Sequence, residues 1–218
     1  MQTISYTSYS APTWRPERWA GVLYLVIIFS GITSEMILRG PLLASFNPAA
    51  GIAHNLGTFR ISLLGDITML AADIGLAVIL FRLIRFTSPS LAVASMVFRL
   101  MQAALIGTGV LMLAAVPLIV TTDPALVSVL LESHAIAYDI GLIFFGIGTM
   151  LLVIALWSRN GVPTLILTGL FLSGLIYIGG GIVRVAFPAH VTTYEAAFIL
   201  PFIAESAFCL WLLIKARV

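Results

Sequence analysis

Long apolar runs, each interrupted by a few polar positions, recur along the chain after residue 19. Runs such as "GVLYLVIIF" and "GLIFFGIGTMLLVIALW" are apolar on every face of a helix and do not alternate apolar with polar residues. A transmembrane β-strand would alternate over about 10 residues, whereas a membrane-spanning helix needs about 20 mostly apolar residues. The pattern therefore predicts helices that cross a membrane.

Six segments are long enough for such a helix. The predicted spans are residues 20–38, 64–84, 91–116, 135–157, 163–185 and 196–214. Short links after the second and fourth spans make the helices that they join antiparallel. Residues 125–132, in a longer link, are predicted to form a short interfacial helix. The fold class is therefore all-α, a polytopic integral membrane bundle of six transmembrane helices.

The composition agrees with a membrane protein and excludes other classes. The 218 residues are 61% hydrophobic and 9% charged, against about 25% charged residues in soluble domains. The net charge of +2 offers no basic footprint, so nucleic acid is excluded as a partner and the lipid bilayer is the first partner expected. Cys209 is the one cysteine, so a disulfide within the chain is excluded.

The chain divides into a tail and one membrane domain. Residues 1–19 are predicted to be a polar N-terminal tail, and residues 20–216 to be the six-helix domain. The tail lacks the apolar core of a secretory signal, so the first span is expected to remain in the mature protein.

Basic residues near the span ends predict the orientation, because cytoplasmic segments carry an excess of Lys and Arg. One side would hold Arg15, Arg18, Arg82, Arg85, Arg159, Lys215 and Arg217, and the other would hold Arg39, Arg60 and Arg184. Both termini are therefore predicted to be cytoplasmic.

Ionisable residues inside the spans are the candidates for function. Each costs about 2.5–3.5 kcal/mol at the centre of a span on insertion scales, so each should face the bundle interior and have a partner. Depth, counted at about 1.5 Å per residue, places Asp73, Arg99, Gln102 and Glu205 in one group near the midplane.

A second group is predicted nearer the non-cytoplasmic face. Glu35 and Arg39 are four residues apart and are expected to form a structural ion pair along the first helix. The other members are Asp66 at the start of the second span with Arg60 before it, His134, Tyr138 and Asp139 in the first turns of the fourth span, and Arg184 at the end of the fifth span. The carboxylates and guanidinium groups balance at this level.

Two interpretations of these charges stay open. They are either interhelical ion pairs that fix the packing, or the lining of a ligand cavity or proton path. The candidate residues for ligand or proton binding are Asp66, Asp73, Arg99, Gln102, His134, Asp139, Arg184 and Glu205.

Two helix-breaking features affect the same spans. The glycines of "YIGGGIVR" favour close helix packing over a locally broken helix. Pro201, one turn before Glu205, is predicted to kink the sixth span.

No catalytic residue is assigned and no cofactor is identified. His54, His134 and His190 with an aspartate could hold zinc, but no short His-x-x-His spacing supports a metal site, and His134 is the residue to which such a site would belong. An enzyme is the least favoured class.

The chain resembles a bacterial family of six-span membrane proteins catalogued as domain of unknown function 4386. The resemblance rests on "RWAGVLYLV", on "GD" at Gly65 and Asp66 followed by "LFRL", on His134 followed by "GLIFFG", and on "SGLIYI" and "PFIAESAFCLWLL". It implies a six-helix integral membrane domain and supplies no agreed activity; the expected location of this multi-pass protein is the bacterial inner membrane. Asp66, His134 and Glu205 are its matched polar positions.

Two functions are compared on this basis. The first is a buried polar pocket that binds or transports a small ligand, lipid, pigment or proton. The alternative is a non-catalytic structural or accessory subunit among other membrane subunits, and a metal-dependent intramembrane hydrolase ranks behind both.

Overall fold

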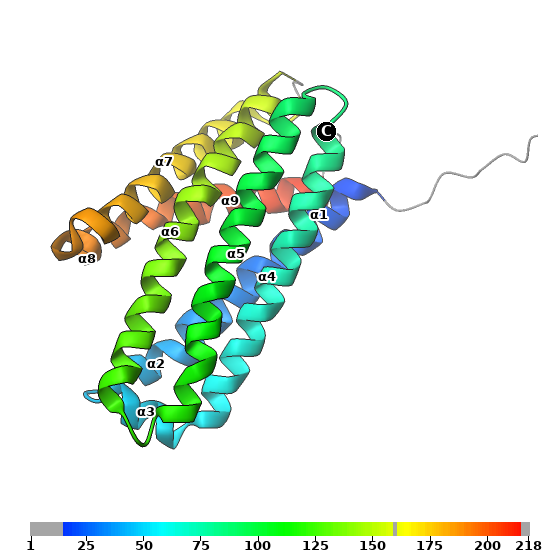
Figure 1. Ribbon diagram of the computed structural model, residues 1–218. Coiled ribbons are helices and arrows are strands. Elements are labelled where there is room, and N and C mark those ends of the chain that lie inside the picture. Colours follow the sequence, from blue (N-terminus) through cyan, green and yellow to red (C-terminus); the bar gives the residue numbers. More distant parts are fainter. Residues whose placement is uncertain (1–14, 159–160, 215–218) are drawn as a thin grey trace, which may run out of the picture.

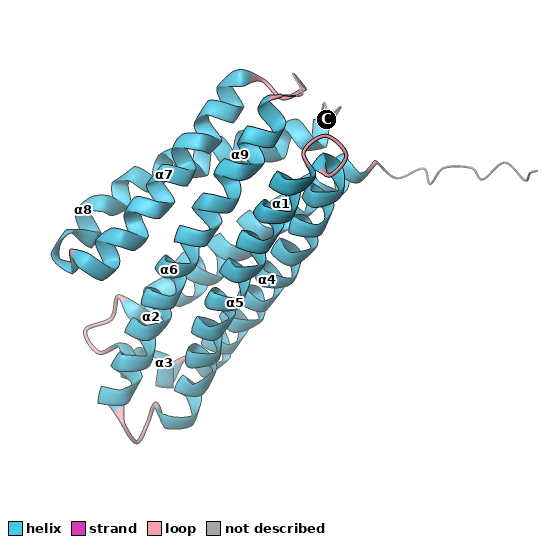
Figure 2. Cartoon of the chain, turned by 45° about the horizontal axis from the view of Figure 1, so that its top comes forward, coloured by secondary structure: helices cyan, strands magenta, loops and turns pink. Residues whose placement is uncertain are grey.

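The computed structural model describes residues 15–158 and 161–214. Six helical segments within them are long and apolar enough to span a membrane. They are Pro16–Leu43, Leu56–Ile84, Pro89–Ile119, Pro124–Trp157, Thr164–Ala186 and Pro188–Ile214. The described residues contain no strand (Figure 2), so the prediction of an all-α membrane bundle is confirmed.

Four of the six segments are single helices, and the first and last are composite. The first consists of α1 (Pro16–Ile32), a π-helix η1 (Thr33–Arg39) and α2 (Gly40–Leu43), and α3 (Pro48–His54) follows it. The single helices are α4 (Leu56–Ile84), α5 (Pro89–Ile119), α6 (Pro124–Trp157) and α7 (Thr164–Ala186). The last segment consists of η2 (Pro188–His190), α8 (Val191–Glu195), η3 (Ala196–Phe198) and α9 (Ile199–Ile214).

Two predicted boundaries are corrected by the structure. The second span begins at Leu56 and not at residue 64, and residues 125–132 are the first turns of α6 and not a separate interfacial helix. The side chain of Asp123 accepts a hydrogen bond of 3.0 Å from the backbone N–H of Leu126, and Pro124 occupies the first turn. An Asp cap followed by proline starts a helix, so the sequence contained this signal.

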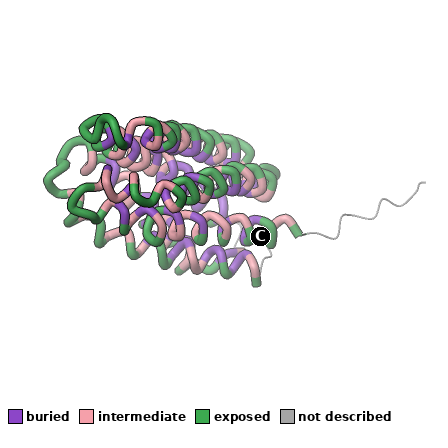
Figure 3. Tube along the Cα trace, turned by 90° about the horizontal axis from the view of Figure 1, so that it is seen from below, coloured by how far each residue is buried: buried purple, intermediate pink, exposed green. Residues whose placement is uncertain are grey.

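The spanning segments form a closed ring in chain order. Each packs against the segment before it and the segment after it, and α9 completes the ring by packing against α1. Figure 1 shows α4, α5, α6 and α7 side by side, with α1 and α9 behind them. Figure 3 shows the buried positions on the sides where the helices face one another. A ring of this kind encloses an axis to which every helix contributes one face.

Small residues set the close approach of α6 and α7. A Cβ on Gly146 would lie 2.5 Å from the carbonyl oxygen of Gly174, so neither helix has room for a side chain at this crossing. Gly180 lies against the ring of Phe198, and Gly181 lies against Ile143. These contacts confirm the close-packing interpretation of the triple glycine, since α7 remains helical through it.

Apolar cores close the bundle at both ends. At the end where α1 begins and α9 finishes, called here the terminal end, one core draws on all six spanning segments, among them Tyr24, Leu80 and Leu212. At the opposite end, called the α3 end, a second core includes Ile52 and Phe59 and takes its residues from α2 to α6. The polar side chains described next lie between these two cores.

Candidate functional site

One cavity of about 90 Å³ lies at the centre of the ring, and all six spanning segments contribute to its wall. Its lining residues are Ile27 of α1, Met69, Leu70 and Asp73 of α4, Gln102 and Ile106 of α5, Tyr138, Leu142 and Phe145 of α6, Tyr177 of α7 and Glu205 of α9. We call it the central cavity. Three of the four predicted midplane residues therefore line one space, and the fourth, Arg99, is bound to Asp73.

Asp73 and Arg99 form a buried ion pair between α4 and α5. The Nη2 atom of Arg99 donates to Oδ1 of Asp73, and the two side chains are 5% or less exposed. The guanidinium also lies over the ring of Phe145, 4.7 Å from its centroid, which is a cation–π contact. The pair is joined by one oxygen only, since Asp73 Oδ2 has no hydrogen-bond partner among the described residues.

Glu205 is held from the other side of the central cavity. The Tyr177 hydroxyl on α7 donates a hydrogen bond of 2.6 Å to Glu205 Oε1 on α9. Pro201 lies one turn earlier, in the first turn of α9, where a proline needs no amide hydrogen bond. The sixth segment changes from the 3-10 turn η3 to α9 at Ile199, two residues before Pro201, so the segment is irregular beside this proline and the kink stays a prediction.

Gln102 on α5 and Tyr138 on α6 are the other polar side chains of the central cavity, and Gln102 has a free acceptor. Its Oε1 atom is buried and has no hydrogen-bond partner in the described part of the chain, as is also true of Asp73 Oδ2. Both atoms are hydrogen-bond acceptors. The cavity therefore has two unsatisfied acceptors beside the carboxylate of Glu205.

A second polar cluster lies toward the α3 end, around Arg39. Its guanidinium is fully buried and donates to Asp66 Oδ2 at 2.6 Å, to Ser62 Oγ at 3.3 Å, and to Glu35. The ion pair of Glu35 with Arg39 is present as the spacing predicts. Asp66 lies well inside α4 and not at the start of its span, and Arg60 is exposed and does not take part.

His134 and Tyr138 lie between the two polar levels. His134 is buried, and its Nδ1 atom has no hydrogen-bond partner among the residues described. Gly109 of α5 faces it closely, since a Cβ there would come within 3.0 Å of Nδ1. The rings of His134 and Tyr138 are 6.1 Å apart, and Tyr138 also lines the central cavity. Both residues lie well inside α6, and not in its first turns as predicted.

Asp139 and Arg184 form a separate pair between α6 and α7. The Nε atom of Arg184 donates to Asp139 Oδ2 at 2.5 Å, and its Nη1 atom lies 3.5 Å from the exposed Glu132. The structure thus distributes the candidate residues over three places: the central cavity, the Arg39 cluster with His134 nearby, and this α6–α7 pair.

No three His, Cys, Asp or Glu side chains within residues 15–158 and 161–214 are placed to hold a metal ion together. His54 and His190 are exposed, in α3 and η2, while His134 is buried in α6. The described residues therefore offer no ligand set for the zinc hydrolase considered from the sequence.

Three aromatic members of the site, Tyr24, Phe145 and Tyr177, were not predicted from the sequence, whereas Tyr138 was. Tyr177 binds Glu205, Phe145 contacts Arg99, and Tyr24 of α1 lies within electrostatic reach of both Arg99 and Glu205. Aromatic residues in an apolar helix carry no distinct pattern, so only the placement of the helices reveals them.

The comparison with known proteins identifies the family of the chain. A family model described as Domain of unknown function (DUF4386) matches residues 19–216, and the chain belongs to that family. No curated protein and no solved structure matches the chain.

Proposed function

We propose that this member of the DUF4386 family binds a small protonated ligand, ammonium or a short alkylammonium ion, in its central cavity. The observation that supports the proposal is the polarity of the free atoms on the cavity wall; the unsatisfied donors Nε and Nη1 of Arg99 belong to a side chain that does not line it. The two buried unsatisfied atoms of the lining side chains, Asp73 Oδ2 and Gln102 Oε1, are acceptors, and Glu205 adds a carboxylate. A ligand that only donates hydrogen bonds complements such a site.

The charges of the site favour the same ligand. Asp73 and Glu205 carry two negative charges when ionised, whereas Arg99 supplies one positive charge and is bound to Asp73. An unbalanced charge inside a membrane is costly, so one further positive charge stabilises the site. A monocation supplies that charge, and so does a proton on a carboxylate.

The size of the cavity limits what it can hold. A volume of about 90 Å³ corresponds to about three times the share of liquid volume that one water molecule occupies. A lipid or pigment needs far more space, so both are set aside for this cavity. The rings of Tyr138, Phe145 and Tyr177 on its wall suit an alkylated ammonium, because aromatic faces attract cations.

Thermal unfolding of the purified protein in detergent tests the proposal. Methylammonium chloride is titrated against sodium chloride at constant ionic strength and pH. A ligand that binds the folded state stabilises it by about 2.7 kcal/mol at 100 times its Kd, so Tm should rise and reach saturation only with methylammonium. Asp73→Asn and Glu205→Gln should abolish the rise. Glu132→Gln, at an exposed carboxylate outside the cavity, should retain it.

Equal responses to both salts, or a methylammonium response that survives both cavity substitutions, would overturn the assignment of the ligand. A protonated carboxylate would then be the remaining source of the positive charge.

We also propose that the chain lies in a bacterial inner membrane with its termini in the cytoplasm. The described ends of α1 and α9 lie at the same end of the bundle, where the Cβ position of Gly21 meets Leu213 (Figure 1). Exposed Arg82 and Arg85 belong to this end, as the excess of basic residues requires. Arg159, Lys215 and Arg217, also used in that prediction, lie outside the described residues, as does most of the predicted tail.

A further inference from the structure

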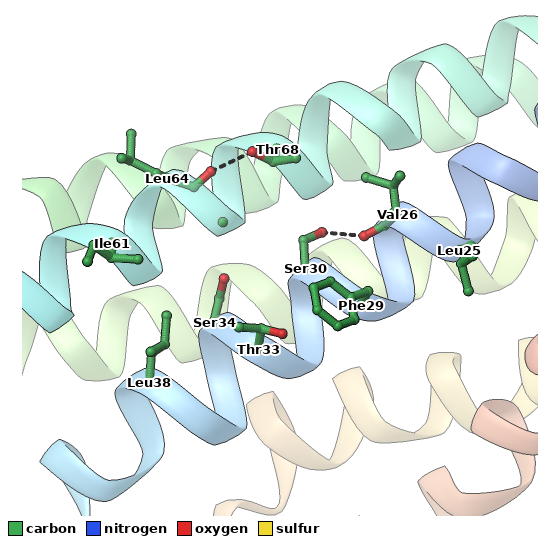
Figure 4. Close-up of a pocket in the computed structure, with 11 residues that line it drawn as sticks. Leu25, Val26, Phe29, Ser30, Thr33, Ser34, Leu38, Ile61, Leu64 and Thr68 are labelled. Carbon is green, nitrogen blue, oxygen red and sulfur yellow. Dashed lines mark hydrogen bonds between the residues drawn. The ribbon is translucent and has the colours of Figure 1, made fainter.

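A groove of about 480 Å³ runs along the outside of the bundle between α4 and the α1–η1 segment. Figure 4 shows Ile61, Leu64 and Thr68 on α4 facing Leu38 and Ser30 on the α1–η1 segment. The groove shares no lining residue with the central cavity, so it is a separate feature. We call it the α1–α4 groove.

The floor and walls of the groove follow from residue size. Ser34 is fully buried at the floor, and a Cβ on Gly65 would overlap its Oγ atom, so α4 and η1 touch closely there. Phe29 is 72% exposed and Leu64 is 63% exposed, so large side chains stand out on both sides of this contact. Small residues at a helix contact with large residues beside it leave an elongated apolar depression.

The position of the groove determines the kind of molecule that can fill it. It extends over residues 25–38 of the first spanning segment and over residues 61–68 of the second, in the half nearer the α3 end, and it is lined mostly by apolar side chains. Water does not occupy such a surface in a bilayer, and a hydrocarbon chain does. The distance from Ile61 to Thr68 is about 10 Å along the helix, which is enough to hold part of an acyl chain.

Arg60 makes this groove different from ordinary lipid-facing surface. It is exposed at the α3 end, one turn before Leu64, and its side chain has no ion pair or hydrogen bond to another described residue. The carboxylates of the nearby cluster, Glu35 and Asp66, are both bound to Arg39. Arg60 is therefore available to an anion, and its long side chain can extend to the level of lipid headgroups.

From these observations we propose that the α1–α4 groove binds an anionic glycerophospholipid of the bilayer. One acyl chain lies in the groove between Phe29 and Leu64, and the phosphate group binds Arg60. The site is independent of ligand binding in the central cavity.

Native mass spectrometry of delipidated protein tests this site with phosphatidylglycerol and phosphatidylcholine of identical acyl chains. Phosphatidylglycerol should bind about fivefold more tightly, as one additional close charge contact predicts. Arg60→Gln should remove the preference. Thr68→Trp, which places a large ring in the groove, should weaken the binding of both lipids.

Arg85→Gln provides the matched control, because Arg85 is an exposed arginine at the terminal end. It should leave the preference unchanged. Equal affinity for the two lipids in the unaltered protein would overturn the proposal. So would a preference that survives Arg60→Gln, or one that Arg85→Gln reduces as much as Arg60→Gln does, since the selectivity would then come from overall charge.

Discussion

The hydroxyl of Tyr177 on α7 lies 2.6 Å from Glu205 Oε1 on α9 and donates a hydrogen bond to it. This contact joins two helices that are separated in the chain by the η2–α8–η3 connection. It also fixes one oxygen of a carboxylate that lines the central cavity. The position of Glu205 therefore depends on a residue of a neighbouring helix.

Tyr177→Phe should destabilise the protein by about 1–3 kcal/mol, because a buried carboxylate loses its hydrogen-bond donor. The measurement is the free energy of unfolding in mixed detergent micelles. Tyr194→Phe is the control, since the Tyr194 hydroxyl donates to the neutral carbonyl of Ile176 at 3.0 Å. Tyr194→Phe should reduce the free energy of unfolding by less than Tyr177→Phe does. If both variants lose the same amount, the charge of Glu205 adds nothing to the contact.

The buried ion pair of Asp73 and Arg99 gives a second prediction. Arg99→Gln alone should cost about 3–5 kcal/mol, because it leaves Asp73 buried and unpaired. The double variant Asp73→Asn with Arg99→Gln should cost less than the sum of the two single variants. Unfolding of all four proteins measures the coupling directly. Additive losses would show that the two groups do not interact in the folded protein.

The charged residues of the central cavity could be predicted by counting how deep each one lies along its span. The partner of each charged residue could not be predicted in this way. Counting residues from the ends of the spans placed Asp73 and Gln102 at one level, and both line the central cavity. The same counting placed Asp66 at one level with Arg39, Arg60 and Arg184, but it did not show that Arg39 is the partner that Asp66 binds. Depth gives the level of a residue, whereas the choice of partner depends on which helices are neighbours and how each is rotated.

The boundaries of the spans show a related limit. Asp123 caps α6 and Pro124 occupies its first turn, and both are helix-start signals that can be recognised in the sequence. The prediction placed the start of this span at residue 135 instead, because it followed the run of apolar residues. The π-helix of residues Thr33–Arg39 has no comparable signal. This π-helix packs against α4, where Arg39 binds Asp66. A contact between two segments of this kind cannot be predicted from the residues of one segment alone.

The guanidinium of Arg39 binds two carboxylates, a buried one on Asp66 and an exposed one on Glu35, and this difference gives a third prediction. The side chain of Asp66 is 5% exposed and that of Glu35 is 52% exposed. Asp66→Asn should therefore destabilise the protein by about 3 kcal/mol or more, while Glu35→Gln should cost about 1 kcal/mol or less. Thermal unfolding of the two variants decides the order. The reverse order would mean that Glu35 is the main partner of Arg39.

The proposed orientation predicts which loops react with a reagent that cannot cross the membrane. Phe46 in the α2–α3 link and Phe86 in the α4–α5 link are both highly exposed, at 109% and 80%, and they lie at opposite ends of the bundle. In intact cells, a charged maleimide should label Phe46→Cys and leave Phe86→Cys unlabelled until the membrane is permeabilised.

Phe46→Cys and Phe86→Cys form a matched pair, because each replaces one exposed phenylalanine and the native Cys209 is buried in both proteins. Cys209→Ser removes any residual reaction of the native thiol. Labelling of Phe86→Cys alone in intact cells would reverse the orientation and place Arg82 and Arg85 outside. The excess of basic residues at the terminal end would then not determine how this bundle inserts.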